Sequence, residues 1–364
     1  MRFLNIPCVV ALCVILSSCL SMDQTFDEGA WRKKIDETHV SDLYAPHYSD
    51  CRYFNPWMPM EEKGLLQMLK WRFTKKQTYT EEGTQHTPAF VAHGRERIQS
   101  MGDEDFIMWV GHATFLMRIN GEFWLTDPIF SERALLPKRK IPPAISVEDL
   151  KSLGVKKINV IISHNHYDHL DTKSILSLPE DTRFYVPLGL KKFLTDLNRL
   201  NVVEMDWWQT ETCGNSINVA CLPMQHWSRR IGQSINSTLW ASFMITTPDL
   251  TIYFAGDSGY FIGYREIGRK FPGIDYVLMP ATAYHPRWFM HYAHVNMEEA
   301  LDAFHDLKAK YFIPTQWGTF HLGDEPVGYA ALELKRKIRE RNLDASRFII
   351  MDIGQIIPTK KKTK

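Results

Sequence analysis

The chain has 364 residues, 45% of them hydrophobic, so it can bury a substantial core in one large domain or two small ones. Its formal net charge of +1 gives no electrostatic case for a nucleic-acid partner. The six cysteines show no zinc-finger spacing and indicate no disulfide framework.

The first residues indicate export. Residues 6–16 form an apolar run behind Arg2, too short to cross a bilayer as a helix but typical of a signal-peptide core. The following Leu-Ser-Ser-Cys, ending at Cys19, resembles the lipobox of bacterial lipoproteins, whose cysteine is lipidated and becomes the new N-terminus. Because Leu20 and not Asp follows, we expect a lipid-anchored protein of the bacterial cell envelope, at the outer membrane facing the periplasm. A plain signal peptide or an uncleaved anchor stays open.

We therefore expect four segments: a signal peptide over residues 1–18, a tether or loosely packed arm over 19–50, one folded domain over 51–358 and a basic tail over 359–364. Within the domain, residues 65–73 mix apolar and cationic side chains, as an interfacial helix would, although a buried arm fits as well.

Strand patterns begin near Asp105. Residues 106–110 and 122–126 flank Asn120-Gly121, which predicts a hairpin. The sequence leaves open whether Cys213 and Cys221, on either side of a turn-like Gly214-Asn215, are bonded across a second hairpin.

Three buried strands are predicted over residues 157–162, 251–255 and 276–280. Helical spacing is present over residues 187–198 and 330–341, and a third helix begins at Asn296, with Glu299 as its reciprocal capping partner. Strands alternating with helices predict an α/β fold, with functional residues just beyond the strand ends.

Three histidines and one aspartate lie within residues 163–169, directly after the first of these strands. His164 and His166 are two apart, so in extended backbone both imidazoles reach the same ion. Asp168 and His169 follow where the chain turns and can reach a second ion. Imidazole nitrogen and carboxylate oxygen suit zinc, iron or manganese.

Four ligands cannot fill two metal sites, so others must come from elsewhere in the chain. His226 follows an apolar run, and Asp257 follows a strand at a point where a carboxylate can bridge two cations. Taken alone, Asp257 would equally be a turn residue.

The ordered pattern His-x-His-x-Asp-His, then His, then Asp resembles the metallo-β-lactamase superfamily. The resemblance implies an αβ/βα sandwich with two divalent metals, for which we expect Zn²⁺, at one edge of the paired sheets. It also implies that His164, His166 and His226 hold one metal, Asp168 and His169 hold the other, and Asp257 bridges them.

Further motifs are similar to the N-acylphosphatidylethanolamine-hydrolysing phospholipase D branch of that superfamily. Gly-His-Ala-Thr-Phe at residues 111–115 and Leu-Thr-Asp-Pro at 125–128 are shared with a wider branch that includes sugar-phosphate lactonases. The more specific motifs are Asn-Pro-Trp at residues 55–57, Leu-Lys-Trp at 69–71, Pro-Arg-Trp-Phe-Met at 286–290, the helix start at 294–300 and Trp-Gly-Thr-Phe at 317–320.

One position departs from this branch, which has a histidine immediately before Trp-Gly-Thr-Phe that completes the second metal site. Here that position is Gln316, and His321 lies five residues later. Either Gln316 supplies an amide oxygen, or His321 replaces the histidine, or water fills the position.

The resemblance also suggests catalytic roles. Asp168 would orient the nucleophile, and His294 would transfer a proton to the leaving oxygen unless it merely packs a helix start. Arg287 would bind phosphate, and Trp288 and Phe289 would meet acyl chains, although such a group is also common on ordinary surfaces. His112 and Asp127 would support the ligands without ligating.

The resemblance thus implies a zinc-dependent phosphodiesterase that hydrolyses membrane phospholipid, held at the membrane surface by a lipid anchor at Cys19. One alternative is a metal-dependent hydrolase of a small soluble substrate, such as a lactone or sugar phosphate. A second is a non-catalytic lipoprotein that keeps the fold as a scaffold. The sequence leaves an oligomer open.

Overall fold

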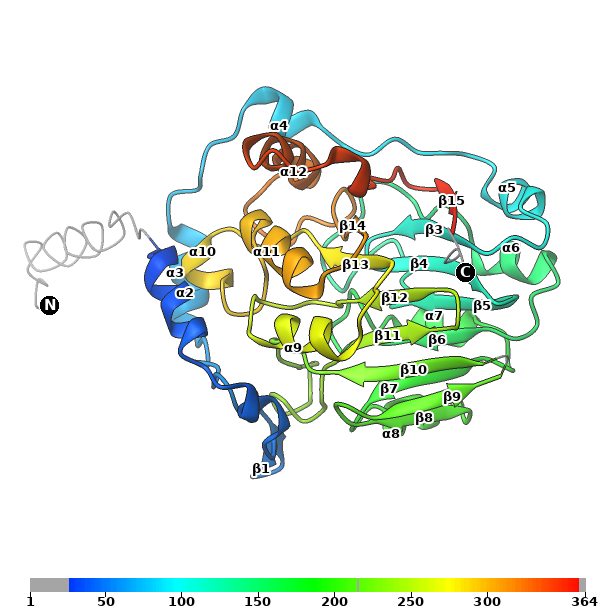
Figure 1. Cartoon of the computed structure of the whole chain (residues 1–364), viewed down its shortest axis with the longest axis horizontal. Coiled ribbons are helices and arrows are strands. Elements are labelled where there is room, and N and C mark those ends of the chain that lie inside the picture. The colour runs from blue at the N-terminus through cyan, green and yellow to red at the C-terminus, as the bar shows by residue number, and fades with distance from the viewer. Residues whose placement is uncertain (1–25, 215, 360–364) are drawn as a thin grey trace, which may run out of the picture.

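A computed structural model describes residues 26–214 and 216–359 of the chain. Its centre consists of two packed β-sheets, one of seven strands and one of six, with helices on their outer faces (Figure 1). This arrangement confirms the predicted α/β class, with strands and helices alternating along the chain.

The seven-stranded sheet has the order β15-β3-β4-β5-β6-β7-β8. It is antiparallel from β15 to β5 and parallel from β5 to β8. Its strands are β3 (Phe106–Gly111), β4 (Thr114–Ile119), β5 (Glu122–Thr126), β6 (Asn159–Ile161), β7 (Arg183–Pro187), β8 (Val202–Met205) and β15 (Ile356–Pro358).

The six-stranded sheet has the order β14-β13-β12-β11-β10-β9, parallel from β14 to β12 and antiparallel beyond. Its strands are β9 (Thr210–Cys213), β10 (Ile217–Leu222), β11 (Ser242–Thr246), β12 (Thr251–Phe254), β13 (Tyr276–Pro280) and β14 (Tyr311–Thr315). A separate pair, β1 (Tyr48–Ser49) and β2 (Arg52–Tyr53), forms a short hairpin.

Helices cover the sheets and form one end of the molecule (Figure 1). They are α2 (Glu28–Asp36), η1 (Val40–Tyr44), α3 (Leu65–Phe73), α4 (Glu81–Gln85), α5 (Gly94–Ser100), α6 (Val147–Ser152), α7 (Thr172–Ser177), α8 (Lys191–Asp196), α9 (Gly263–Lys270), α10 (Arg287–Met290), α11 (Met297–Leu307), α12 (Tyr329–Glu340) and η2 (Ala345–Arg347).

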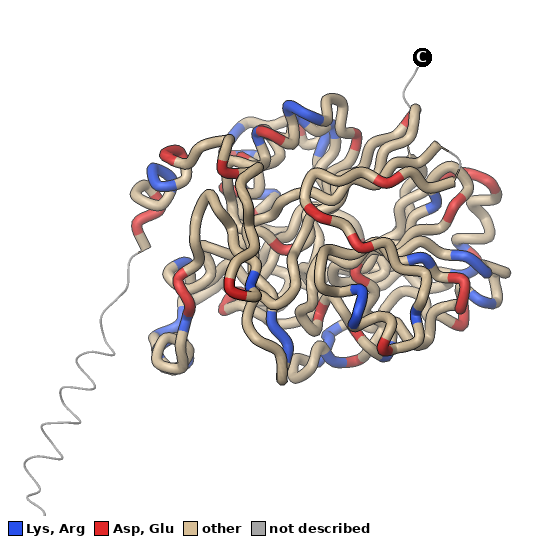
Figure 2. Tube along the Cα trace, turned by 90° about the horizontal axis from the view of Figure 1, so that it is seen from below, with Lys and Arg blue, Asp and Glu red and all other residues tan. Residues whose placement is uncertain are grey.

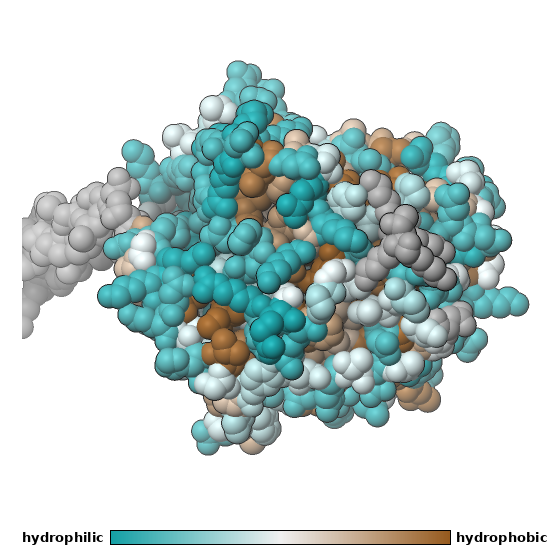
Figure 3. All heavy atoms as spheres, viewed as in Figure 1, coloured by the Kyte–Doolittle hydropathy of each residue, from teal (hydrophilic) through white to brown (hydrophobic). Residues whose placement is uncertain are grey.

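Helix α11 illustrates how the sequence specifies this packing. The Asn296 side chain accepts from the Glu299 backbone N–H, and the Glu299 side chain accepts from that of Asn296, which is the predicted capping box. Buried Ala300, Phe304 and Leu307 recur at helical spacing and seat the helix on the six-stranded sheet. Its polar face points outward, and the surface seen in Figure 3 is largely hydrophilic.

Both sheets direct strand ends toward one edge. The carboxyl ends of β5 and β6 lead to Asp127 and to residues 163–169, while those of β10, β12 and β14 lead to His226, Asp257 and Gln316. Parallel strands share the edge at which their carboxyl ends meet, so distant donors converge there.

The predicted hairpin needs correction. The strand before Asn120-Gly121 is β4, not residues 106–110, and β3 pairs with β4 on its other side. The apolar residues on both sides of Gly111 and His112 concealed the turn at His112 and Ala113. The second hairpin forms between β9 and β10, but its cysteines do not face each other: Cys213 is opposite Ile217, and all three described cysteines are free.

The expected arm over residues 19–50 is also wrong for its described part. Trp31 and Ile35 on α2, and Leu43 on η1, are buried in the main core. The polar composition of this segment suggested a loose arm, but these few apolar residues pack it against the core. Residues 1–25, which include Cys19 and the predicted signal peptide, and residues 360–364 of the basic tail lie outside the described residues.

Residues 65–73 form the predicted helix, and none of its side chains is buried. Leu65 and Leu66 are 71% and 80% exposed, which excludes a buried arm. Among the described residues, no helix is long and apolar enough to cross a membrane. Basic and acidic positions are interspersed along the trace (Figure 2).

Candidate metal centre

The loop after β6 carries four candidate donors in a largely buried setting. His164 and His169 are fully buried, and His166 and Asp168 are partly exposed. The backbone N–H groups of His169 and Leu170 both donate to the His166 carbonyl, which closes the loop as a tight turn. In an extended segment these side chains would point alternately to two opposite faces, whereas the turn brings them together.

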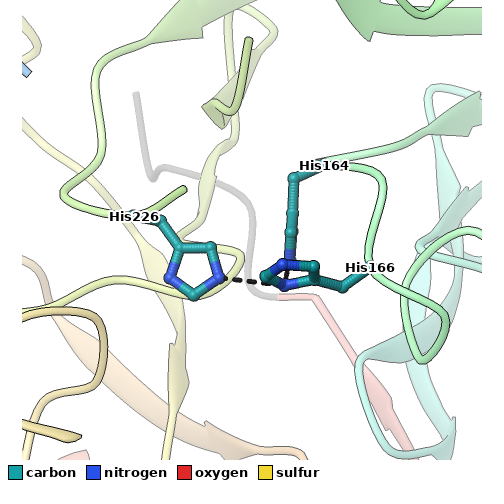
Figure 4. A group of neighbouring side chains, drawn as sticks. All are labelled: His164, His166 and His226. Carbon is teal, nitrogen blue, oxygen red and sulfur yellow. Dashed lines mark hydrogen bonds between the residues drawn. The ribbon is translucent and has the colours of Figure 1, made fainter. Parts of the chain in front are cut away.

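A first donor group consists of three imidazoles that face one another (Figure 4). His166 Nδ1 lies 2.8 Å from His164 Nε2 and 3.2 Å from His226 Nε2. The opposite nitrogens are held from behind, His164 Nδ1 by Ser163 Oγ at 2.9 Å and His226 Nδ1 by the Ala293 carbonyl at 3.1 Å. The facing nitrogens of His164 and His226 therefore carry lone pairs.

These three rings are neutral at physiological pH. Burial, reinforced for His164 by the neighbouring histidines, lowers the pKa of His164 and His226 well below the usual value and that of His166 to about 4. Neutral imidazole is the form that ligates a metal. His166 Nδ1 can carry one proton and so can satisfy only one of the two lone pairs that face it, whereas a cation would satisfy all three nitrogens.

A second donor group adjoins the first. His169 Nε2 lies 3.4 Å from Asp168 Oδ2 and 3.3 Å from Asp257 Oδ2, and its Nδ1 is 2.6 Å from Asp127 Oδ2. Asp257 Oδ2 also lies 3.9 Å from His226 Nε2, so this carboxylate borders both groups.

The charges of the second group explain what it would bind. Burial opposes charge on His169, but Asp257, Asp168 and Asp127 outweigh it and raise the pKa of His169 well above its usual value. Burial likewise opposes charge on Asp168 and Asp257, yet His169 holds the pKa of both carboxyls well below the usual range. The group therefore favours positive charge between its carboxylates and Nε2, which a metal cation would supply.

Asp127 supports this group from beneath. Its fully buried carboxylate accepts from the Ser163 backbone N–H at 2.7 Å and from Ser163 Oγ at 2.5 Å, in addition to His169. His112, Asp127 and Gln316 all have left-handed backbone φ, at 52°, 31° and 72°. Such conformations concentrate at functional sites, where the surrounding structure maintains them.

The structure separates the two proposed substitutes for the missing histidine. Gln316 is buried, and its Nε2 donates to Asp257 Oδ1 at 2.5 Å, while its Oε1 has no hydrogen-bond partner. His321 is exposed and belongs to none of the donor groups among the described residues. Expecting His321 to replace the histidine is therefore wrong, because its side chain is exposed to solvent and joins no donor group.

His294, in the loop between α10 and α11, borders the centre. His294 Nδ1 is buried without a hydrogen-bond partner, 4.0 Å from Asp257 Oδ2. A pocket of about 450 Å³ opens over the metal donors. Its lining includes His166, Asp168, Asp257 and His294.

Arg287 does not line this pocket, so the expectation that it binds phosphate is wrong. Its guanidinium pairs with Glu28 and Glu299, each at 2.8 Å, and donates to the His294 carbonyl at 2.9 Å. These contacts occupy its donors, so Arg287 holds the loop that carries His294.

The two aromatic residues after Arg287 are placed differently. Phe289 lines the metal pocket, where it stacks on Trp71 with ring centroids 4.8 Å apart. Trp288 lies outside that pocket, beneath Lys70. A helical turn points successive residues in different directions, and Trp288 accordingly lines a different pocket from Phe289.

Sequence reasoning missed four residues at this site. Lys63 and Arg229 are the basic residues of the pocket lining, and Asn55 donates to the His226 carbonyl at 3.1 Å. Ser163 links Asp127 to His164. Asn55 and Ser163 belong to motifs in the sequence, but those motifs indicated no role for either residue. No local sequence pattern indicated Lys63.

The described residues fit two metal ions. Ligands bonded at about 2.1 Å in tetrahedral geometry lie roughly 3.4 Å apart. The facing atoms of the two groups lie between 2.8 and 3.4 Å apart. Lone pairs converge in one group and carboxylates meet an imidazole in the other, as a binuclear site requires.

Two packed mixed sheets with this His and Asp centre at one edge define a metal-dependent hydrolase of the metallo-β-lactamase fold. A family model described as a beta-lactamase superfamily domain matches residues 124–317. The chain belongs to the metallo-β-lactamase superfamily.

Within that superfamily, the chain is similar to N-acyl-phosphatidylethanolamine-hydrolyzing phospholipase D proteins. It is 33% identical over 273 residues to the phospholipase D 1 of Caenorhabditis elegans, covering 69% of this chain and 75% of that protein. It is 35% identical over 228 residues to the mitochondrial protein of Saccharomyces cerevisiae, covering 60% and 48%. A metallo hydrolase structure from Ignicoccus hospitalis shares the fold, with a TM-score of 0.55, 18% identity and coverage of 71% and 99%.

We predict that Asp127→Asn weakens metal binding about 10- to 100-fold, the range typical of residues that orient ligands. An amide places a donor NH₂ against the Ser163 or His169 donors, so one of these contacts is lost. Titration of metal-free protein with Zn²⁺ against a competing chelator would measure the change. Asp103→Asn, at an exposed carboxylate paired with Arg118, is the matched control. Unchanged affinity in Asp127→Asn would show that the buried bonds do not orient the ligands.

Proposed function

We propose that this protein is a zinc-dependent phosphodiesterase that hydrolyses membrane phospholipid on the head-group side of the phosphate. The observation that carries the proposal is a pocket that combines the metal donors with an apolar wall and two cations. The products would be phosphatidic acid and the head-group alcohol or its N-acyl derivative. The names of the worm and yeast relatives describe hydrolysis of N-acyl-phosphatidylethanolamine, the same class of reaction.

The apolar wall suits acyl chains. Besides the metal donors, the pocket lining includes Met60, Met68, Trp71, Leu136 and Phe289. A soluble sugar phosphate would leave such a wall exposed to water, whereas a lipid chain would bury it.

Two cations suit a phosphodiester. Lys63 Nζ lies 4.3 Å from the centroid of the Phe289 ring, and Arg229 is exposed at the pocket. Either side chain can donate to a phosphoryl oxygen. They take the role first expected of Arg287, whose donors are occupied by Glu28 and Glu299.

His164, His166 and His226 would hold one metal, while Asp168 and His169 would hold the second beside bridging Asp257. Two bound divalent cations would lower the pKa of a water molecule and stabilise charge on the phosphoryl oxygens. Asp168, partly exposed at the pocket floor, would accept a proton from that water and orient it. His294, which lines the pocket and whose Nδ1 has no hydrogen-bond partner, would pass a proton to the leaving oxygen.

Helix α3 would bring the pocket to a bilayer. Leu65, Leu66 and Phe73 are 71%, 80% and 67% exposed, with Lys70 and Arg72 beside them on the same helix. Met68 and Trp71 of the same helix line the pocket. An exposed apolar surface with adjacent cations suits the interface of an anionic membrane.

The main prediction concerns substrate choice. Purified protein with Zn²⁺ should cleave N-acylated or ordinary phosphatidylethanolamine in micelles faster than a soluble phosphodiester or a lactone. Asp168→Asn should lower lipid cleavage by about 100-fold or more, the scale of a lost proton-transfer group.

Product analysis by mass spectrometry distinguishes the alternatives. Rapid lactone hydrolysis without lipid cleavage would favour the small-substrate enzyme, and inactivity on every compound with both metals bound would favour the scaffold. His305→Asn, at a histidine whose side chain is 91% exposed, controls for the handling of variants.

A second prediction concerns Lys63. Burial lowers the pKa of Lys63 to about 8, so its positive charge is present below that pH and lost above it. We expect kcat/KM for anionic lipid to fall as pH rises through about 8, since kcat/KM reports groups of the free enzyme.

The Lys63→Met variant should lower kcat/KM about 10- to 100-fold below pH 8, as expected for loss of a charged hydrogen bond, and should remove this alkaline decline. Lys63→Arg should keep activity and move the decline to higher pH. Lys75→Met, at an exposed position outside the metal pocket, should behave as the unaltered protein. An alkaline decline that persists in Lys63→Met would assign it to another group.

We also propose that Cys19 carries a lipid anchor that holds the enzyme at the outer membrane. A tether restricts the enzyme to a surface and raises its effective concentration near lipid. Cys19→Ala should move the protein from the membrane fraction to the soluble fraction, as measured by fractionation of cell envelopes. An unmodified Met1 on the native protein, found by mass spectrometry, would exclude the anchor.

A further inference from the structure

His112 is held rigidly beneath the second donor group. It occupies the turn between β3 and β4, and its side chain is fully buried. Its backbone N–H donates to Thr319 Oγ1 at 2.9 Å, and its carbonyl accepts from the Gln316 backbone N–H at 3.0 Å and from Trp109 Nε1 at 2.8 Å. The ring is therefore fixed in place relative to residues 316–319.

The two ring nitrogens of His112 face different groups. Nδ1 lies 3.4 Å from the Gln316 carbonyl oxygen, an acceptor that has no proton to give. Nε2 lies 3.1 Å from Asp168 Oδ2, also an acceptor, so a ring that carries one N–H can satisfy only one of the two acceptors. A cation between Nε2 and the carboxylate removes this conflict.

The same position completes the second donor group. His169 Nε2, Asp168 Oδ2 and His112 Nε2 lie close enough together to share one ion. The 3.1 Å between His112 Nε2 and Asp168 Oδ2 matches the 3.4 and 3.3 Å that separate His169 Nε2 from Asp168 and Asp257. These contacts are comparable to the roughly 3.4 Å between ligands of one tetrahedral ion.

The amide of Gln316 is held by hydrogen bonds and does not take part in this donor group. Its Nε2 donates to Asp257 Oδ1 at 2.5 Å and to the Gly256 carbonyl at 3.3 Å. Rotating the amide by 180° would set its oxygen against both of these acceptors, so the nitrogen must face them. Gln316 thus orients the bridging carboxylate.

We propose that His112 Nε2 is a protein ligand of the second metal, together with Asp168, His169 and bridging Asp257, and that Gln316 positions Asp257 without ligating. The second site then has two imidazoles, and the lost histidine is replaced from the opposite sheet. This inference rests on the binuclear centre but not on any particular substrate.

The test counts metal ions and histidine ligands, so it is independent of the substrate assay. His112→Asn keeps an amide near the position of Nδ1 and removes Nε2. Full-length protein would be titrated with Zn²⁺ against a chelator, with circular dichroism to verify the fold. His321→Asn is the matched control at an exposed histidine, and Gln316→Met tests the competing ligand.

We expect His112→Asn to lose the second metal by more than the about 10- to 100-fold typical of a residue that only orients ligands. Gln316→Met should lose no more than that range, and His321→Asn should lose nothing. A smaller loss in His112→Asn, or a larger one in Gln316→Met, would overturn the proposal.

A measurement on the unaltered protein guards against misfolding of the variants. In the Co²⁺-loaded protein, each ligating histidine contributes one strongly shifted, exchangeable imidazole N–H signal in the proton NMR spectrum. We expect five such signals, from His112, His164, His166, His169 and His226. Four signals would exclude His112 as a ligand.

Discussion

The buried carboxylate of Asp127 is the constraint on which the metal centre depends. With no water to solvate it, the group must be satisfied by protein donors, and Ser163 and His169 are the donors within reach. The hydrogen bonds that Asp127 accepts from Ser163 and His169 fix both the start and the end of the loop after β6. Through Ser163 Oγ, Asp127 also fixes the ring of His164, so one charge orients ligands in both donor groups.

A separate set of contacts around Arg287 holds the loop that carries His294. Arg287 links Glu28 of helix α2 to Glu299 of α11 and to the carbonyl of His294. Two of these side chains, Arg287 and Glu28, are 259 residues apart in the sequence. Helix α2 therefore helps to hold the loop beside the pocket, although the composition of its segment suggests a loose arm. The pocket itself combines an apolar wall with the metal donors and the cations of Lys63 and Arg229.

Local features of the fold were predictable, and contacts between distant segments were not. The strand before His164 and the capping box at Asn296 follow from periodicity within a few residues. The metallo-β-lactamase fold was implied by the resemblance of the ordered histidines and aspartates to that superfamily. The role of Arg287 was wrong because a guanidinium's partners depend on tertiary packing, and Glu28 gave no local signal. Lys63 was missed for the same reason, since only the folded chain sets it in the pocket.

The compact spacing of the loop after β6 has a thermodynamic consequence. Four donors within residues 163–169 stay close together even when the chain is unfolded. An unfolded chain would therefore retain part of its affinity for metal. It would lose only the contribution of donors such as His226, which reach the metal site only when the chain is folded. Because ligand binding stabilises a protein only by the difference between its folded and unfolded states, metal should protect this fold less than its affinity alone would suggest. The same local affinity would allow the ion to be captured early and the second sheet to close over it.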